Sequence, residues 1–239
     1  MKPHPALTEE HEAFRDTVRR FVERELLPHA AAWDEAGEFP RELYRKAARA
    51  GLLGVGYPEE YGGTERTGET PVADHFFHIV SAEELARVGA GGLSASLFSH
   101  TIGAPPIAAV GSEELKRRVL PAILSGEKIS ALAITEPSGG SDVASLRTKA
   151  IREGNEFVVN GEKTFITSGM RADWITMAVR TGDAGTTEPP RFAAPQGGFG
   201  ALGRPGGAQG AGGISMILVP GAAAGLSRTS LDKMGWWCS

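Results

Sequence analysis

The hydrophobic pattern changes near Gly126, and this change divides the 239 residues into two parts. Before Gly126, apolar residues recur at the three- and four-residue spacing of helices. After Lys128, they gather in short runs rich in Ile, Val and Thr, which is typical of strands. Helices followed by strands indicate an α+β protein. We therefore expect an all-helical domain at residues 1–126 and an antiparallel β domain, of barrel or sandwich type, at residues 127–239.

Helix and strand boundaries follow from local signals. Thr8 is a suitable N-cap for a first helix that Pro28 closes, and Ser112 is a suitable N-cap for the last one. Helices are expected at residues 9–26, 40–50, 72–88, 93–102 and 113–124. Strands are expected at residues 129–134, 148–152, 157–160, 174–180 and 214–219, with the second and third paired as a hairpin.

Residues 182–213 fit neither pattern, because 11 of these 32 residues are Gly and 4 are Pro. Such a segment has little apolar surface to bury, so we expect a disordered insertion between two strands that would otherwise be neighbours. A GxGxxG match at residues 198–203 lies inside it. Because no strand precedes the match and no helix follows, we do not assign it to dinucleotide binding.

Composition excludes several classes of function. The net charge of −4 gives no reason to expect nucleic acid as a partner. No apolar run approaches the roughly 18 residues of a membrane span. Cys238 is the single cysteine, which excludes an internal disulfide and favours a cytoplasmic location. We expect Cys238 to be a packing residue beside two tryptophans, and we expect no metal site at His75 and His78.

The segment from Ile134 to Asp142 (ITEPSGGSD) begins where a strand should end. Pro137 stops the strand ladder, and two glycines permit unusual backbone angles and close approach of a ligand. Thr135 and Ser141 add hydroxyl groups, and a turning backbone can present several N–H groups together. This chemistry suits the carbonyl-rich edge of a flavin ring or a pyrophosphate. A plain turn is the alternative.

A second segment runs from Asn160 to Ser168 (NGEKTFITS). We expect a turn at Asn160 and Gly161 and then a strand, in which Phe165 and Thr167 face the same side. An aromatic wall beside a hydroxyl donor suits a planar heteroaromatic ring. Taken alone, the segment favours an ordinary hairpin.

Together the two segments resemble the acyl-CoA dehydrogenase family. The resemblance includes TEPSGGSD and VVNGEKTFITSG, and extends to GSEELKRRVLPAILSGEKISALA before them and GISMILVPGAAAGLSRTSLDKMGW after them. It implies an N-terminal helical domain, a middle β domain and a C-terminal four-helix domain. The sequence is expected to stop before that third domain, which carries the catalytic glutamate of the family.

The resemblance also implies a flavin site, with FAD as cofactor. Leu132, Ala133, Ile134 and Thr135 are expected along the flavin ring, and Gly140 and Ser141 near the pyrophosphate. Ser141 is also expected to touch the acyl-CoA substrate. Phe165, Ile166 and Thr167 are expected on the other side of the ring.

The reaction implied is α,β-dehydrogenation of an acyl-CoA thioester, with electrons passing to an electron-transfer flavoprotein and with a tetrameric enzyme. Because the base is expected outside this sequence, we expect the chain alone to be inactive. Two alternatives stay open. One is a non-catalytic module that binds FAD or acyl-CoA, and the other is a fragment of a flavin-dependent acyl-CoA oxidase. The motifs leave the acyl chain length open.

Overall fold

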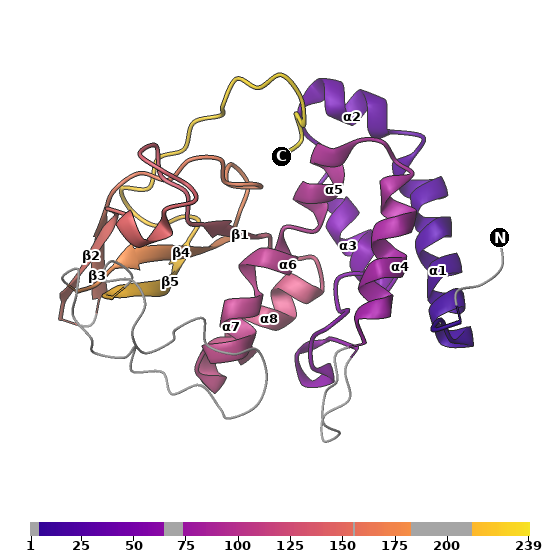
Figure 1. Cartoon of the computed structure of the whole chain (residues 1–239), viewed down its shortest axis with the longest axis horizontal. Coiled ribbons are helices and arrows are strands. Elements are labelled where there is room, and N and C mark those ends of the chain that lie inside the picture. Colours follow the sequence, from indigo (N-terminus) through magenta and orange to yellow (C-terminus); the bar gives the residue numbers. More distant parts are fainter. Residues whose placement is uncertain (1–4, 65–73, 155, 183–211) are drawn as a thin grey trace.

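A layer of helices packs beside a five-stranded sheet (Figure 1). The computed structural model describes residues 5–64, 74–154, 156–182 and 212–239. The helical part comes first in the chain and the sheet follows it, so the expected α+β class is confirmed.

The helical part contains short and medium-length helices, one of which continues into a π-helical turn. The elements are α1 (Glu9–Phe21), the π-helix η1 (Val22–Leu26), α2 (Ala30–Ala36), α3 (Glu42–Arg49), the 3₁₀ helix η2 (Glu59–Tyr61), α4 (His75–Ala86), α5 (Gly91–Leu97), α6 (His100–Gly103), α7 (Pro105–Val110) and α8 (Glu113–Leu124).

Side-chain caps fix the N-terminal ends of α1 and α8, as the sequence predicts. The Thr8 hydroxyl accepts a bond from the His11 amide at 3.4 Å, and His11 Nδ1 accepts one from the Thr8 amide at 2.9 Å. This reciprocal arrangement satisfies two amide groups at the start of α1. The Ser112 hydroxyl accepts a bond from the Leu115 amide at 3.2 Å, which confirms the predicted start of α8.

Other helix predictions need correction. The single helix expected at residues 93–102 is wrong, because the backbone leaves helical geometry at Phe98 and divides the segment into α5 and α6. Neither α2 nor α7 was expected, since each is only six or seven residues long. The predicted start of the helix at residue 72 lies outside the described residues.

The sheet is built around its longest buried strand, β4. Its strands are β1 (Ser130–Ala133), β2 (Lys149–Glu153), β3 (Glu156–Asn160), β4 (Trp174–Arg180) and β5 (Ile214–Pro220). On one side, β4 pairs in parallel with β1 and, through Arg180 and Lys149, with β2. On the other side it pairs antiparallel with β5. The expected hairpin, β2 with β3, is confirmed.

The sheet is therefore mixed, and the expectation that it is antiparallel throughout is wrong. Both β1 and β2 run in the same direction as β4. Parallel strands need crossover connections rather than tight hairpins. The barrel or sandwich form stays a prediction. The antiparallel register of β4 and β5 confirms that neighbouring strands flank residues 182–213. The disorder expected there concerns residues 183–211, which lie outside the described part of the chain.

Small polar groups join the helical layer to the sheet. The Ser99 hydroxyl donates to the Ser130 carbonyl at 2.8 Å, and the Thr176 hydroxyl donates to the Gly103 carbonyl at 2.5 Å. Both donor side chains are buried. Because α6 lies directly against β1, the sheet edge that leads into the candidate site is held by the helical part.

The segment after β5 returns to the helices (Figure 1). Cys238 is buried in the helical core, where its thiol donates to the Trp33 carbonyl at 3.1 Å. The predicted packing role of Cys238 is confirmed, and burial raises the pKa of its thiol to about 11. Trp236 covers Gly91 and Gly92: a Cβ added at Gly91 would meet the indole within 3 Å, and one added at Gly92 would meet the Trp236 backbone within 3 Å.

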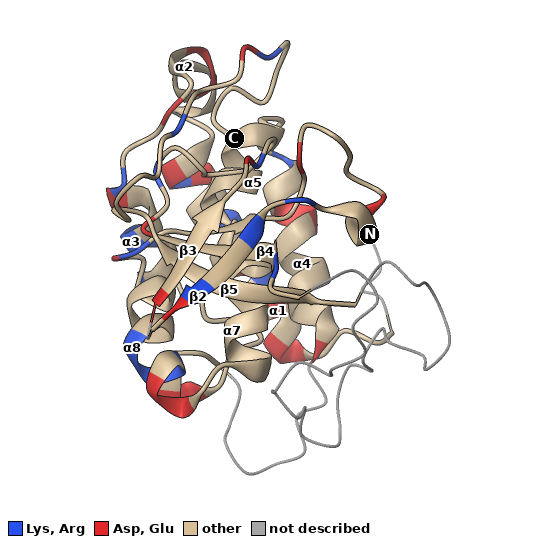
Figure 2. Ribbon diagram, turned by 90° about the vertical axis from the view of Figure 1, so that its left-hand side faces the viewer, with Lys and Arg blue, Asp and Glu red and all other residues tan. Residues whose placement is uncertain are grey.

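Charged residues are distributed unevenly over the ribbon. Figure 2 shows them mainly on the helices and at the β2–β3 turn, whereas β4 has only Arg180 and β5 has none. Among the residues that the structure describes, no helix is long and apolar enough to cross a membrane.

Candidate functional site

A tight turn follows β1 and displays the first predicted motif. Glu136 and Gly139 exchange two backbone hydrogen bonds, of 3.1 and 3.0 Å, which close the turn. Residues 137–142 are exposed. A cleft of about 250 Å³ lies beside them, lined by Glu136, Ser138, Gly139, Asp142, Ser145, Leu146 and Arg147.

The two glycines of the turn leave a surface open. Neither Gly139 nor Gly140 has a positive φ, so the turn does not use the unusual backbone angles that glycine permits. A Cβ added at Gly139 would meet nothing within 4 Å, and one at Gly140 would make only ordinary contact with Thr135, at 3.5 Å. The amides of Gly140 and Ser141 have no hydrogen-bond partner among the described residues. These features fit close approach of an anionic group.

A buried ion pair holds the turn against the second predicted segment. Lys163 Nζ lies 2.9 Å from Glu136 Oε1 and donates to the Ile134 carbonyl, also at 2.9 Å. Both charged side chains are about 5% exposed. The Thr164 amide donates to the Thr135 carbonyl at 2.9 Å. The two segments therefore form one surface.

Glu136 has the hydrogen-bond environment of a permanently ionised carboxylate. The Arg147 amide donates to Oε2 at 2.7 Å, and the Thr148 amide and hydroxyl donate to Oε1 at 2.8 and 2.6 Å. Burial alone would raise the pKa of Glu136, but the bonds from Lys163, Thr148 and Arg147 lower it to about 2. A carboxylate with so low a pKa is a weak base, so Glu136 is a structural anchor of the turn.

The second segment is a loop, and the strand expected after Gly161 is wrong. Phe165 and Ser168 both have a positive φ, of 56° and 61°, which is incompatible with a strand. Ser168 is buried, and its hydroxyl bonds to the Ser96 hydroxyl at 2.8 Å and donates to the Ser96 carbonyl at 3.2 Å. This anchor on α5 bends the loop and turns Phe165 outward.

Phe165 and Thr167 consequently differ in their surroundings. The Phe165 ring is 75% exposed, so most of its area is free to contact another molecule. Thr167 is half-buried, and its hydroxyl lies 3.0 Å from the Ser239 hydroxyl. Since a hydroxyl can accept one bond and donate another, Thr167 can bond to Ser239 and still donate outward. Ile166 is half-buried between them.

The remaining predicted residues follow the alternation of β1. Leu132, in β1, is half-buried, and so are Ile134 and Thr135, which follow the end of the strand. Ala133 points to the opposite face from Leu132 and is packed in the core beneath the sheet. Only the backbone of Ala133 is therefore available to a bound molecule.

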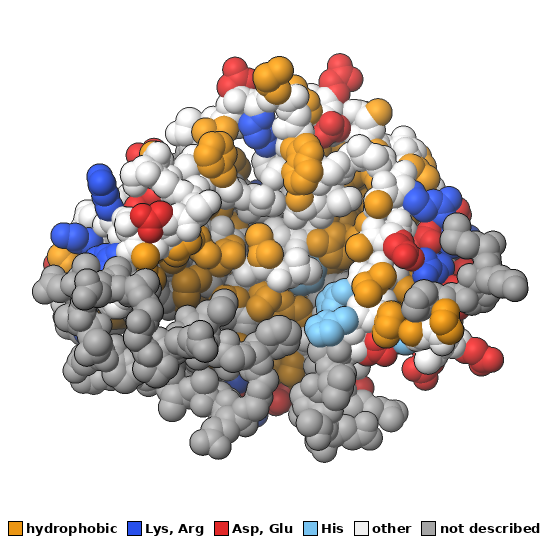
Figure 3. Space-filling view, in the orientation of Figure 1, with side chains coloured by type: hydrophobic (Ala, Val, Ile, Leu, Met, Phe, Trp, Pro, Cys, Tyr) orange, Lys and Arg blue, Asp and Glu red, His pale blue; other side chains and the backbone are white. Residues whose placement is uncertain are grey.

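Sequence reasoning missed Lys163 entirely and placed Glu136 in the turn without its partner. Charge marks only Glu136, which stands alone in the neutral stretch at residues 129–141, whereas Lys163 directly follows Glu162 and gives no such signal. Figure 3 shows that apolar side chains gather on the face that includes this region. The exposed large apolar residues near the loop and in the final segment are Phe165, Met170, Leu231, Met234, Trp236 and Trp237.

Comparison with known proteins identifies both parts of the chain. Residues 8–127 match a family model described as the acyl-CoA dehydrogenase N-terminal domain, and residues 131–237 match the acyl-CoA dehydrogenase middle domain. The long-chain specific mitochondrial acyl-CoA dehydrogenase of Sus scrofa is 38% identical over 72% of this chain and 38% of its own length.

Solved structures agree with these matches. A Mycobacterium smegmatis structure, described as a candidate acyl-CoA dehydrogenase, is 46% identical, with a TM-score of 0.78 over 97% of this chain and 53% of that one. The Bacillus anthracis acyl-CoA dehydrogenase complexed with FAD is 28% identical, with a TM-score of 0.75 over 98% of this chain and 34% of that one. The chain spans about half the length of the curated relatives it matches.

Proposed function

Because the chain belongs to the acyl-CoA dehydrogenase family, we propose that its turn at residues 134–142 and its loop at residues 161–168 form one wall of an FAD site. This wall serves the α,β-dehydrogenation of an acyl-CoA thioester. The buried Lys163–Glu136 pair carries the proposal, because it fixes the turn and the loop as one surface. The FAD-bound relative from Bacillus anthracis supports the choice of cofactor.

Each part of the wall suits a different part of the cofactor. Leu132, Ile134 and Thr135 border the ring with their half-buried side chains, while Ala133 contributes its backbone. Phe165, Ile166 and Thr167 border it from the loop. The unpaired amides of Gly140 and Ser141 suit the pyrophosphate, and the exposed hydroxyl of Ser141 suits the phosphate-bearing end of the substrate.

The residues of the wall position and polarise, and they do not abstract the proton. When bound, FAD supplies the hydride acceptor for the reaction. When the Thr167 hydroxyl accepts the bond from Ser239, its own proton is free for donation to the cofactor. Glu136 stays ionised and hydrogen-bonded to Lys163, Thr148 and Arg147. The α-proton of the substrate must therefore be removed by a different carboxylate. We therefore propose that residues 1–239 alone bind FAD without catalysing dehydrogenation.

Membership of the acyl-CoA dehydrogenase family also suggests features of domain organisation, electron acceptor and assembly, which we propose for this chain. The helical part, residues 1–126, and the β part, residues 127–239, act as separate domains. The electron acceptor is an electron-transfer flavoprotein, and the assembled enzyme is a tetramer. We keep the cytoplasm as the proposed location, although the pig relative is mitochondrial.

A fluorescence titration tests the flavin wall. Purified residues 1–239 are titrated into FAD, and quenching of the flavin emission reports binding. The variant Gly140→Val should bind at least about tenfold more weakly, because its side chain fills the open approach to the unpaired amides. Gly235→Val is the control for adding the same side chain elsewhere, since a Cβ at Gly235 meets nothing within 4 Å. Equal binding by both variants would remove the pyrophosphate assignment.

Addition of acyl-CoA to the FAD complex tests the chemistry separately. Under anaerobic conditions we expect no bleaching of the flavin absorbance. Bleaching would contradict the assignment of Glu136 as an anchor rather than a base, and would leave the flavin wall intact. Hydrogen peroxide formed in air with bleaching would identify the oxidase alternative. Failure of the wild-type chain to bind FAD would contradict the proposal as a whole.

A further inference from the structure

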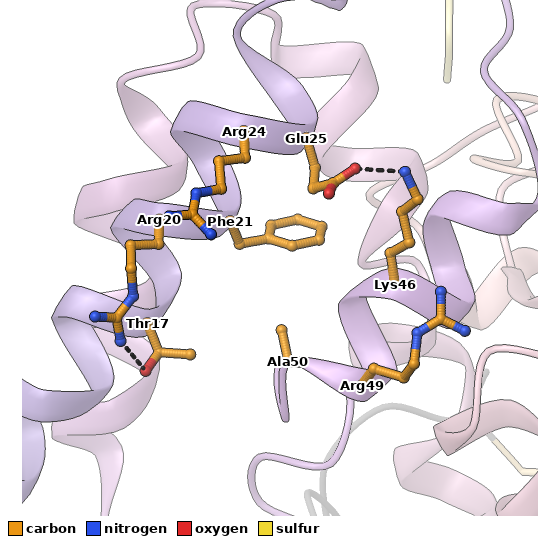
Figure 4. Close-up of a pocket in the computed structure, with 8 residues that line it drawn as sticks. All are labelled: Thr17, Arg20, Phe21, Arg24, Glu25, Lys46, Arg49 and Ala50. Carbon is orange, nitrogen blue, oxygen red and sulfur yellow. Dashed lines mark hydrogen bonds and ion pairs between the residues drawn. The ribbon is translucent and has the colours of Figure 1, made fainter.

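A groove of about 390 Å³ lies between the first and third helices and shares no residue with the candidate flavin wall (Figure 4). Phe21 and Ala50 line it with apolar surface. Four cationic side chains surround it, two from the first helical segment and two from α3. They are Arg20, Arg24, Lys46 and Arg49.

The positive charges in the groove are only partly compensated. Lys46 pairs with Glu25 at 2.6 Å, and Arg49 pairs with Glu42, outside the groove, at 2.8 Å. Arg20 donates only to the Thr17 hydroxyl, at 3.4 Å. Arg24 has no partner among the described residues. Two guanidinium groups therefore lie at the groove without a counter-charge, in a chain whose net charge is −4.

The helix backbone is irregular at the same place. At Val22, α1 changes to the π-helix η1, and the Leu27 amide donates to the Val22 carbonyl at 2.9 Å, five residues back. Arg24 is carried by this turn. Single π-helical turns are rare and are frequently found at functional sites. The turn and the charge cluster are independent observations at one groove.

We propose that this groove binds a small organic polyphosphate with an aromatic part, of the nucleoside diphosphate class. The planar forks of Arg20 and Arg24 match phosphate oxygens, whereas Lys46 and Arg49 on the opposite side are already paired with Glu25 and Glu42. The arginine stems and Ala50, above a Phe21 ring that is 6% exposed, provide apolar surface for the ring.

Isothermal titration with ADP, at low and at high salt, tests the proposal. Wild-type protein should bind ADP, adenosine should bind at least about tenfold more weakly, and added salt should weaken ADP binding. The double variant Arg20→Gln with Arg24→Gln should bind ADP about a hundredfold more weakly, as expected for loss of two charged hydrogen bonds. Its melting temperature should not fall, because two like charges one turn apart are removed.

Two controls separate this groove from other sites. Arg118→Gln removes an exposed arginine from α8, outside the groove, and should leave ADP binding unchanged. Gly140→Ala alters the proposed pyrophosphate contact of the flavin wall and should also leave it unchanged. Loss of ADP binding in the Gly140 variant, retention in the double arginine variant, or no binding by the wild type would each overturn the proposal.

Discussion

Lys163 neutralises a buried carboxylate and joins the turn to the loop of the proposed flavin wall, so its loss should lower stability. We expect Lys163→Met to lower the free energy of unfolding by about 3–5 kcal/mol, because Glu136 would be left as a buried charge without a cation. Urea unfolding measures this. The control Lys116→Met, whose partner is exposed, should cost less than about 1 kcal/mol. Similar losses in both variants would contradict the assigned role.

The same carboxylate predicts a dependence of stability on pH. The pKa of Glu136 is about 2 in the folded chain, below its ordinary value of 4.5, so its contribution is complete above pH 4.5 and is lost as the pH falls toward 2. Glu136→Gln should therefore make acid unfolding shallower in this window. The dependence should not vanish, because the pKa of Glu84 is also lowered to about 2, by Arg19 and Arg87. Thermal melts at stepwise pH report both effects.

Two residues of the loop share a strained backbone but differ in what their side chains contribute. Phe165→Gly should leave stability unchanged or raise it by up to about 1 kcal/mol, since positive φ is relieved and the exposed ring loses little packing. FAD affinity should nevertheless fall. Ser168→Gly should destabilise by about 1 kcal/mol, because its buried bonds to Ser96 are lost. Unfolding and FAD titration of both variants test the contrast.

At the scale of helices and strands, the sequence predicted correctly those elements whose bounds depend on caps and turn residues close by in the chain. The cap at Ser112 and the apolar spacing after it fixed the bounds of α8, and turn residues fixed the hairpin of β2 and β3. These features depend on residues close in the sequence, so the sequence alone contains them. The placement of the TEPSGGSD turn directly after a strand was correct for the same reason.

The errors occur where distant contacts decide the geometry. The loop at residues 161–168 alternates like a strand, but the Ser168 bond to α5 bends it instead. The parallel pairing of β1 with β4 joins segments some forty residues apart. The Lys163–Glu136 pair also spans 27 residues, so no local pattern indicates it.

The pairing of β4 with β5 makes a prediction about the segment between them. The two strands are in register up to Arg180 and Ile214, and the Thr181 amide donates to the Gly213 carbonyl at 2.8 Å. Replacing residues 184–210 with Asn-Gly should leave the fold and FAD binding intact. The shorter connection should raise the free energy of unfolding by about 1–2 kcal/mol, because its closure costs less entropy. A clear loss of stability would show that the segment contributes packing.

At the scale of the whole molecule, the contact between α6 and β1 joins the helical layer to the sheet. A Cβ added at Gly103 would lie about 3.0 Å from the backbone of Ala131, which cannot move freely within β1. Gly103→Ala should therefore destabilise by about 1–3 kcal/mol. Gly235→Ala, which meets nothing within 4 Å, is the matched control. Urea unfolding followed by tryptophan emission distinguishes the two variants. Equal stability would show that the contact between α6 and β1 can accommodate an added methyl group.

The return of the chain to its helices has a consequence for the order of events during synthesis on the ribosome. Cys238 completes the helical core at a contact with Trp33, 205 positions earlier, and Trp236 covers the start of α5. The helical part is made first, yet it keeps an uncovered apolar surface until the whole sheet has been translated. Such a contact raises the contact order and slows folding. The nascent helices should therefore depend on chaperones until the segment after β5 emerges.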